Sequence, residues 1–478
     1  MEIRNLAPQN VWSIFDAITK VPRPSKKEGK IREWLVNWAK ENNVECHVDK
    51  TGNVLFRVPA TPGYENHPTV VMQGHMDMVC EKNSDVKHDF EKDPIDTYID
   101  GDWVTARGTT LGADDGAGVA LAMAVMTDPE AKHGPLETLV TYDEETGMTG
   151  ANNLEEGFMT GKILINLDSE NEGQIFMGCA GGKDTCAVFR YAPIPSPERY
   201  YAKIKVSGLL GGHSGGDIHL GRANANKVLV RFLLSQPDLV LARIEGGNLR
   251  NAIAREAMAV IGLPAARRDQ LVADLNQFAS VIEGEVGDIE KGFKMTIESA
   301  EKPEYIIEPA VANKLLKALQ ACPHGVQGMS RAMKDLVETS TNLASVKMPE
   351  TGIIRVETSQ RSSVESEKED IALTVRTVFE MAGAEVTQGH GYPGWKPNVN
   401  SPILKIAAQT YRDLYNQEPE VMAIHAGLET GLFLTKYPDL DMISIGPTME
   451  GIHSPEEKLS IHSMKTSYAY LKEILARC

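Results

Sequence analysis

The sequence lacks any segment that could direct export or cross a membrane. Its N-terminal residues, MEIRNLAPQNVWSIF, contain no basic stretch followed by an apolar one, as a signal peptide would. The apolar stretch at residues 117–126 is far shorter than the roughly 20 residues that a membrane-spanning helix needs. We therefore expect a cytoplasmic protein that has no membrane partner.

Cysteine is scarce, and positive charge is in short supply. The 6 cysteines form no CxxC pair, which favours reduced thiols over a disulfide framework or a cysteine-rich structural zinc site. Cys80 has no paired base in the sequence that could activate it as a nucleophile. With 49 basic and 66 acidic residues the net charge is −17, and the sequence contains no run of basic residues. Such a surface repels phosphate backbones, so we expect no nucleic-acid partner.

The length of 478 residues predicts at least two domains. Periodicity predicts helices at 11–18, 31–39, 224–234, 271–282, 366–381 and 402–414, and strands at 53–58, 69–73, 138–142, 163–167, 201–207, 258–262, 353–359 and 442–445. The Gly/Pro-rich segment HGYPGWKPN at 390–398 predicts a crossing between domains.

We expect an α/β fold with a central mixed sheet flanked by helices. Residues 1–183 and 395–478 would form this domain. Residues 184–394 would form an inserted α+β lid, because 201–207 alternates between polar and apolar residues like a half-exposed strand.

Five side chains that can bind metal stand in short, distinctive contexts. They are His75 in GHMDMV, Asp114 in LGADDGAG, Glu145 in YDEETGMTGA, Asp168 in LINLDSE and His453 in GIHSPEE. Two histidines and three carboxylates suit a pair of divalent ions, with one carboxylate bridging them. The glycines around Asp114 permit close approach of the backbone, so Asp114 is the expected bridge, while Asp115 would cap the following helix.

Two neighbouring carboxylates could complete such a site. Asp77 follows His75 by two residues at a strand end, so both lie on one face and Asp77 could orient the imidazole. Glu144 precedes Glu145; on extended backbone the two side chains would diverge, leaving Glu144 as a general base for water. Taken singly, these motifs also suit a loop histidine, a helix cap or a solvated acidic turn. Together they favour hydrolysis at a two-metal centre.

The motifs GHMDMV, GADDG, DEETG and GIHSPEE, with the strand-end Asp168, resemble the M20 metallopeptidases. Further phrases that resemble dipeptidases of that family are HGPLETLVTYDEETGMTGA, MGCAGG, GGHSGGDIH, NANKVLVRFL, GGNLRNAI, YPGWKPNVNSPI, IHAGLETGLF and MISIGPTMEGIHSPEE. With GHMDMV they extend from residue 74 to residue 457. Many members have a lysine-containing DxKGG at the bridging Asp, whereas this chain has DDGAG, so the subgroup rests on the other phrases.

The resemblance implies a role for each site residue. Each subunit would bind two Zn²⁺, which Mn²⁺ or Co²⁺ could replace. His75 and Asp168 would bind one ion, Glu145 and His453 would bind the other, and Asp114 would bind both. Glu144 would be the general base and Asp77 would tune His75. In the lid, His213 would polarise the scissile carbonyl, while Asn251, Arg361 and the backbone of Gly427 would hold the substrate. The resemblance also implies a homodimer, in which His213 could come from the partner's lid. The structural alternatives are that His213 is a histidine in a turn, Asn251 a helix cap and Arg361 a surface arginine.

The function that the resemblance implies is hydrolysis of unblocked dipeptides, including Xaa-His. Other M20 reactions on the same metal centre, deacylation of N-acyl amino acids or carboxypeptidase activity, remain alternatives that the five ligands do not separate. A non-catalytic binding protein on the same fold is a further alternative. An intact Glu144 beside all five ligands argues against it.

Overall fold

The computed structural model describes residues 2–478, which divide into two compact units. Unit 1 comprises the chain up to Gly178, Trp395–Ala423 and Leu428–Cys478; unit 2 comprises Cys179–Gly394 and Ile424–Gly427. The sequence placed all of 395–478 in the first domain, whereas residues 424–427 lie in unit 2. The backbone N–H of Ala180 explains this, because it donates to the carbonyls of Ile424 and Ala426 at 3.1 and 3.0 Å.

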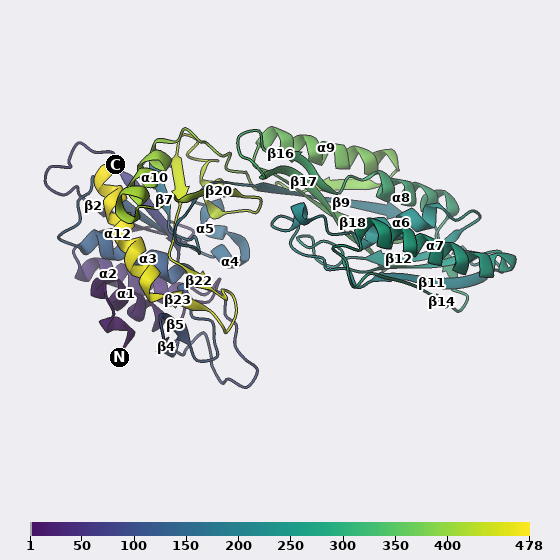
Figure 1. The fold of residues 1–478 in the computed structure, drawn as a ribbon, viewed down its shortest axis with the longest axis horizontal. Helices are drawn as coiled ribbons and strands as arrows, with labels where there is room; N and C mark the ends of the chain where they lie inside the picture. Colours follow the sequence, from purple (N-terminus) through teal and green to yellow (C-terminus); the bar gives the residue numbers. More distant parts are fainter. Residues whose placement is uncertain (1) are drawn as a thin grey trace. The chain divides into compact units, whose positions relative to one another are not determined.

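Unit 1 is built around an eight-stranded mixed sheet (Figure 1). Its strands lie in the order β1 (Glu45–Val48), β2 (Val54–Val58), β6 (Leu136–Thr141), β3 (Val70–His75), β7 (Ile163–Asn166), β21 (Asp441–Ser444), β8 (Gln174–Cys179) and β20 (Glu420–Ile424). The four central strands, from β6 to β21, are parallel, while β1 and β2 add antiparallel strands at one side. The carboxyl ends of the parallel strands therefore meet at one edge of the sheet, where sites in α/β folds usually form.

The remaining elements of unit 1 are helices and a small second sheet. The helices are η1 (Ile3–Asn5), α1 (Gln9–Thr19), α2 (Gly29–Glu41), α3 (Ala113–Thr127), α4 (Glu144–Gly147), α5 (Thr149–Asn152), α10 (Pro402–Tyr415), α11 (Glu429–Phe433) and α12 (Ile461–Arg477). The small sheet has the order β22 (Met449–Glu450), β23 (Lys458–Ser460), β5 (Trp103–Ala106) and β4 (Thr97–Asp100). Helix α3 is buried on all sides because its residues are almost all small or apolar.

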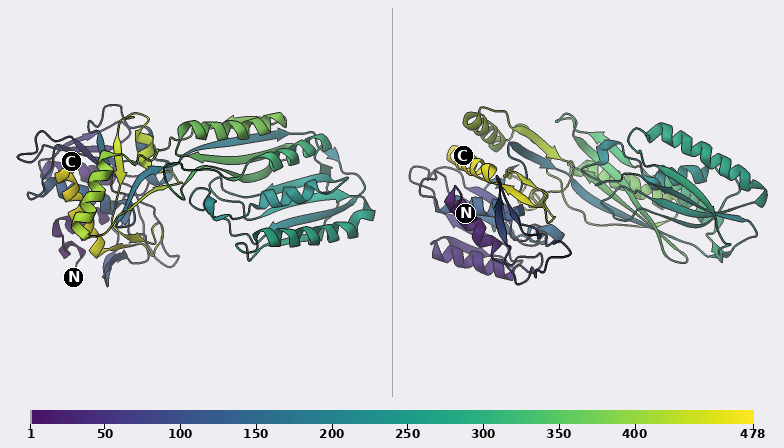
Figure 2. Two further views of the ribbon diagram at one scale, coloured as in Figure 1. Left: turned by 45° about the horizontal axis from the view of Figure 1, so that its top comes forward. Right: turned by 60° about the horizontal axis from the view of Figure 1, so that its bottom comes forward.

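Unit 2 contains a nine-stranded antiparallel sheet. The order is β14 (Lys294–Ser299), β11 (Tyr200–Ser207), β13 (Ala257–Leu263), β12 (Val240–Gly246), β17 (Val337–Glu350), β18 (Ile353–Ser362), β9 (Gly181–Arg190) and β19 (Glu385–Gln388), with β16 (Gly325–Met329) also on β17. Helices α6 (Ala225–Leu234), α7 (Arg268–Val286), α8 (Pro309–Ala321) and α9 (Glu365–Met381) cover one face (Figure 2). Short elements are η2 (Ile218–Leu220), η3 (Ala265–Arg267) and the pair β10 (Ile194–Pro195) and β15 (Tyr305–Ile306).

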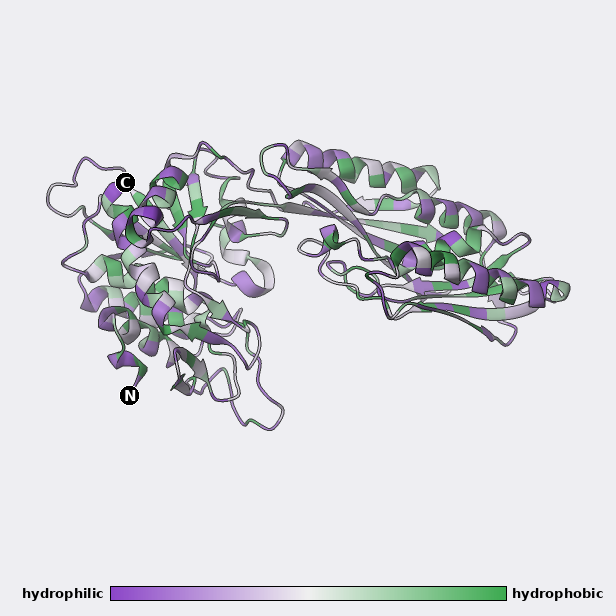
Figure 3. Ribbon diagram, viewed as in Figure 1, coloured by the Kyte–Doolittle hydropathy of each residue, from purple (hydrophilic) through white to green (hydrophobic). Residues whose placement is uncertain are grey.

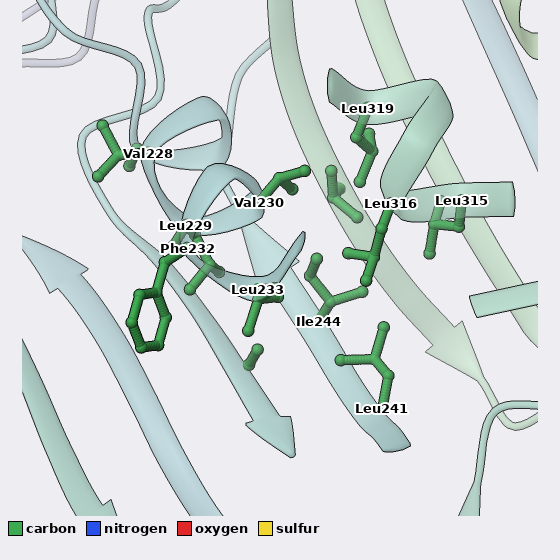
Figure 4. Close-up of a cluster of buried hydrophobic side chains, with 14 of the residues drawn as sticks. Val228, Leu229, Val230, Phe232, Leu233, Leu241, Ile244, Leu315, Leu316 and Leu319 are labelled. Atoms are coloured by element: carbon green, nitrogen blue, oxygen red, sulfur yellow. The ribbon is translucent and has the colours of Figure 1, made fainter. Parts of the chain in front are cut away.

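The core of unit 2 lies between its helices and the sheet. Leu229 and Phe232 of α6, Leu316 of α8 and Leu241 of β12 are buried together (Figure 4). The four helices carry both hydrophobic and hydrophilic residues along their length (Figure 3), as expected of helices with one buried face. The predicted α/β fold with a mixed sheet and an inserted α+β region is confirmed.

The expected helices and strands are all present, with ends that differ by a few residues. Within residues 2–478, no helix is both long and apolar enough to span a membrane.

Candidate metal centre

The five predicted ligands come from separate elements at one edge of the sheet in unit 1. His75 ends β3, Asp168 follows β7 by two residues, and Glu145 lies in α4, just after β6. Asp114 lies in the first turn of α3, and His453 lies between β22 and β23. The parallel alignment of β3, β6 and β7 carries three of these side chains to the same place.

The carboxylate of Asp114 lies between two groups of ligands. Its Oδ1 is 2.9 Å from His75 Nε2, and its Oδ2 is 3.1 Å from His453 Nε2. His75 Nε2 is also 3.5 Å from Asp168 Oδ1, while His453 Nε2 is 3.1 Å from the Glu145 carboxylate. The structure therefore brings all five predicted residues together, in two groups that share Asp114.

The electrostatics of this cluster fit divalent cations. Burial raises the pKa of the Asp168 carboxyl well above its usual range, and the negative charge of Asp114 adds to this rise. Hydrogen bonds to Asp114 and Glu145 raise the pKa of His453 to about 10. This cluster holds several carboxylates close together and stabilises added positive charge. Such a site suits divalent ions that bind nitrogen and oxygen ligands.

Asp77 connects the loops that carry the ligands. It is fully buried, and its Oδ1 lies 3.4 Å from His75 Nδ1. Its two oxygens accept hydrogen bonds from the backbone N–H groups of Glu144 and Glu145, at 3.0 and 3.2 Å, and from Ser25 Oγ at 2.8 Å. Burial by itself would raise the pKa of Asp77, but His75 and these hydrogen bonds lower it to about 2. Asp77 is therefore an ionised partner for the imidazole.

The expectation of extended backbone at Glu144 and Glu145 is wrong, because both residues lie in helix α4. Asp143 takes a left-handed conformation with φ of 53° and turns the chain after β6. Neighbouring helical residues point about 100° apart, so the two side chains still diverge. Burial, helped by the carboxylates of Glu145 and Asp114 and opposed by His75, raises the pKa of Glu144 to about 7. A carboxyl with this pKa can both take and return a proton near neutral pH.

Asp115 has the supporting role that the sequence suggested. Its Oδ1 accepts the backbone N–H of Gly118 at 3.0 Å, which caps helix α3, and its Oδ2 accepts the N–H of His75 at 3.3 Å. Burial raises the pKa of the Cys80 thiol to about 11, so it stays protonated near neutral pH.

The sequence reasoning missed Glu429, the first residue of α11. It is 2 % exposed, and its Oε2 accepts hydrogen bonds from Gln73 Nε2 at 2.6 Å and Thr141 Oγ1 at 2.7 Å. Gln73 Oε1 in turn accepts from Asn166 Nδ2 at 2.6 Å. Gln73 and Asn166 are polar residues inside apolar strands, two positions before His75 and Asp168, and they were the available signal for this network.

Glu429 predicts a pH-dependent stability of the metal-free protein. Burial, with the charge of Glu144 adding, raises the pKa of Glu429 from 4.5 to about 8. The folded state then binds this proton more tightly than the unfolded state, so the stability that Glu429 contributes falls as pH rises from about 4.5 to about 8.

Glu429→Gln removes this dependence on pH. In urea unfolding, we expect the stability of the variant relative to the wild type to increase steadily between pH 5 and pH 8; parallel curves would refute this. Glu156→Gln, at an exposed position, is the control.

The predicted lid residues lie in unit 2 and occupy one region of it. His213 Nδ1 accepts the N–H groups of Gly215 and Gly216 at 3.3 and 3.0 Å, so its proton is on Nε2. The backbone carbonyl of Asn251, an exposed residue, accepts the N–H of Ser214 at 2.8 Å.

Arg361 and Gly427 both contact Tyr392, which the sequence reasoning missed. Arg361 is 6 % exposed; its Nη1 donates to Tyr392 Oη at 2.8 Å, and its buried Nε has no partner among residues 2–478. A Cβ added at Gly427 would lie 2.8 Å from Tyr392 Cε2, so only glycine fits against this ring. His425, which lies beside Arg361, shares a 2.7 Å hydrogen bond with Ser340 Oγ. Burial, with Arg361 adding, lowers the pKa of His425 to about 3.

Comparison with known proteins shows close relatives of full length. The sequence profile of peptidase family M20/M25/M40 matches residues 71–477. The chain is 43% identical over 478 residues to the cytosol non-specific dipeptidase of Escherichia coli (strain K12), covering 99% of this chain and 98% of the relative. The crystal structure of aminoacylhistidine dipeptidase from Vibrio alginolyticus matches with a TM-score of 0.95 and 43% identity, covering 100% and 98% of the two chains.

A more distant structure shares the fold alone. The aminopeptidase PepT of Bacillus cereus matches with a TM-score of 0.59 at 15% identity, over 98% of each chain. The family profile covers most of the sequence, and the high identity extends over the whole chain. This protein therefore belongs to peptidase family M20/M25/M40.

Proposed function

We propose that the protein is a metallo-dipeptidase that hydrolyses unblocked dipeptides, including those with a C-terminal histidine. The observation that carries this proposal is its 43% identity, over nearly the full length of both chains, to a cytosol non-specific dipeptidase. The grouping of five ligands around Asp114 supports a two-metal hydrolytic centre. We also propose that the protein works in the cytoplasm as a homodimer, which light scattering after size-exclusion chromatography would test.

In this proposal His75 and Asp168 would hold one divalent ion, Glu145 and His453 would hold the other, and Asp114 would be shared by both. Zinc is the proposed metal, with manganese or cobalt as substitutes. Such ions, when bound, supply Lewis acidity and lower the pKa of water. Asp77 keeps His75 oriented with its Nε2 directed toward Asp114 and Asp168.

Glu144 is the proposed general base. It takes a proton from the water that attacks the peptide carbonyl, and it then delivers that proton to the amine that leaves. In the metal-free protein the pKa of Glu144 is raised to about 7, which supports a carboxyl that can return a proton as well as take one.

The residues of unit 2 are proposed to bind the substrate. His213 carries its proton on Nε2, which supports hydrogen-bond donation to the oxyanion that develops on the carbonyl. Arg361, with Asn251 and the backbone at Gly427, would hold the dipeptide. The buried, unpartnered Nε of Arg361 is suited to a charge-assisted bond with the free carboxylate.

Arg361→Lys is expected to raise KM for a dipeptide about 10- to 100-fold with little change in kcat, because a charge-assisted hydrogen bond contributes about 1.5–3 kcal/mol. Steady-state kinetics on Ala-His and on its C-terminal amide measure this effect. The amide has no free carboxylate for residue 361 to bind, so its KM and kcat should be nearly the same in the wild type and in Arg361→Lys. Arg355→Lys, at an exposed position of the same strand, is the matched control. An equal loss on both substrates would show that Arg361 does not bind the carboxylate.

A substrate panel tests the function itself. The zinc-loaded protein is assayed on Ala-His, β-Ala-His, a tripeptide and an N-acetyl amino acid. We expect cleavage of the dipeptides alone, and loss of that cleavage after chelation with recovery on adding zinc. Preference for the tripeptide would indicate a different peptidase of the family, and preference for the N-acetyl amino acid would indicate a deacylase. No turnover of any substrate would support a binding protein.

A further inference from the structure

One buried carboxylate next to the metal centre has no part in the proposed chemistry. Glu457 lies four residues after His453 and is 2 % exposed. Its Oε2 accepts the backbone N–H groups of Leu111 and Gly112 at 2.7 and 2.9 Å. Its Oε1 accepts those of Ala113 and Asp114 at 2.7 and 3.3 Å. A single side chain thus satisfies four consecutive backbone donors.

These four donors belong to the segment that carries the bridging carboxylate. The first N–H groups of a helix have no partner within the helix, and Gly112 at the N-cap of α3 offers no side chain to satisfy them. Asp114 has φ and ψ of −81° and 111°, which are not helical values. The backbone of Asp114 is therefore held by Glu457 and not by the regular hydrogen bonds of a helix.

Arg23 binds the same segment from its carbonyl side. It is 1 % exposed, and its Nη1 donates to the carbonyls of Asp77 at 2.7 Å and Met76 at 3.2 Å. Its Nη2 donates to the carbonyl of Gly112. Arg23 therefore connects the segment that leads to Asp114 with the loop that follows His75.

We propose that Glu457 and Arg23 are positioning residues that hold the Asp114 carboxylate between the two ligand groups, so that it can bridge two ions. This inference rests on the proposed two-metal centre. Asp114 reaches His75 with one oxygen and His453 with the other, so a small rotation of its backbone would lose one of these contacts. Glu457 prevents that rotation, and Arg23 sets the distance to the His75 loop.

The test is manganese binding to the wild type and to Glu457→Gln, measured by calorimetry and by electron paramagnetic resonance. An amide of the same shape accepts through one oxygen only and turns an NH₂ toward two backbone donors. We expect the second ion to bind about 10- to 100-fold more weakly, the range known for residues that support metal ligands. We also expect the exchange-coupled signal of a bridged manganese pair to be replaced by that of isolated ions.

Two controls separate positioning from general stability. Glu137 is equally buried in β6, and its Oε2 accepts the N–H groups of Thr160 and Gly161 at 2.7 and 3.0 Å. It lies at the end of β6 away from α4, so Glu137→Gln should lower the melting temperature without changing the coupled signal. Glu456→Gln, at the exposed neighbouring position, should change neither.

The outcomes distinguish this inference from the function on which it rests. A coupled pair in the wild type that is unchanged in Glu457→Gln would overturn the inference and leave the proposed function standing. No coupled pair in the wild type would overturn the inference together with the two-metal centre on which it rests, while the substrate panel would still test the dipeptidase function. If Glu457→Gln does not fold, Arg23→Lys is measured in the same way, since it keeps the charge and reaches fewer carbonyls; an unchanged coupled signal in that variant would equally overturn the inference.

Discussion

Glu144→Gln is expected to lower kcat for dipeptide hydrolysis by about 10²- to 10⁴-fold, the usual contribution of a general base. Metal content should not change, because Glu144 is in neither of the two ligand groups around Asp114. The amide keeps the shape of the side chain but cannot accept the proton of the attacking water. The Glu144 N–H remains available to Asp77, so the position of α4 should be retained. Kinetics on Ala-His and metal analysis of the same samples measure both properties.

Glu156→Gln, an exposed position soon after α4, should leave both properties unchanged. If Glu144→Gln lost metal together with activity, Glu144 would be a ligand and not a base. An unchanged kcat with full metal content would mean that another group takes the proton.

Asp114→Asn is expected to lower activity by about 10³-fold or more, which corresponds to about 4 kcal/mol of transition-state stabilisation. It should also release at least one of the two ions. An amide is a neutral and weaker ligand for a divalent cation, and Asp114 is the only one of the five residues that contacts both histidines. Elemental analysis after gel filtration, and calorimetric titration with zinc, measure the loss.

Asp100→Asn, at the exposed end of β4, is the control and should bind two ions with wild-type activity. Two ions retained in Asp114→Asn would contradict a bridging role. One ion retained with nearly full activity would show that a single metal is sufficient for the reaction.

Local patterns were enough to predict most of the fold. The strands that become β3, β6 and β7 are short apolar runs, and α1 buries Val11, Phe15 and Ile18 on one face. Burial of one face repeats every few residues, so it leaves a pattern that can be recognised without a structure. The helical turn at Glu144 could not be recognised in this way. It depends on a left-handed residue and on the carboxylate of Asp77, which is 67 residues away from Glu144 in the sequence.

The residues that support the site were also beyond the sequence reasoning. Glu429 meets Gln73 across 356 residues, and Glu457 meets Asp114 across 343. Neither glutamate has a sequence context that distinguishes it from a surface glutamate. Only burial and the hydrogen-bond donors around each of them, side chains for Glu429 and backbone groups for Glu457, show that they are structural.

The sequence by itself determined which elements form and which side chains could bind metal, because hydrophobic periodicity and short motifs are local properties of the chain. The tertiary structure decided that Asp114 presents one oxygen to His75 and the other to His453, 339 residues away. It also decided that Glu457 and Arg23 hold the Asp114 segment, and that Arg361 lies against Tyr392. These contacts join distant segments, and their geometry exists only once packing has brought the strand ends together.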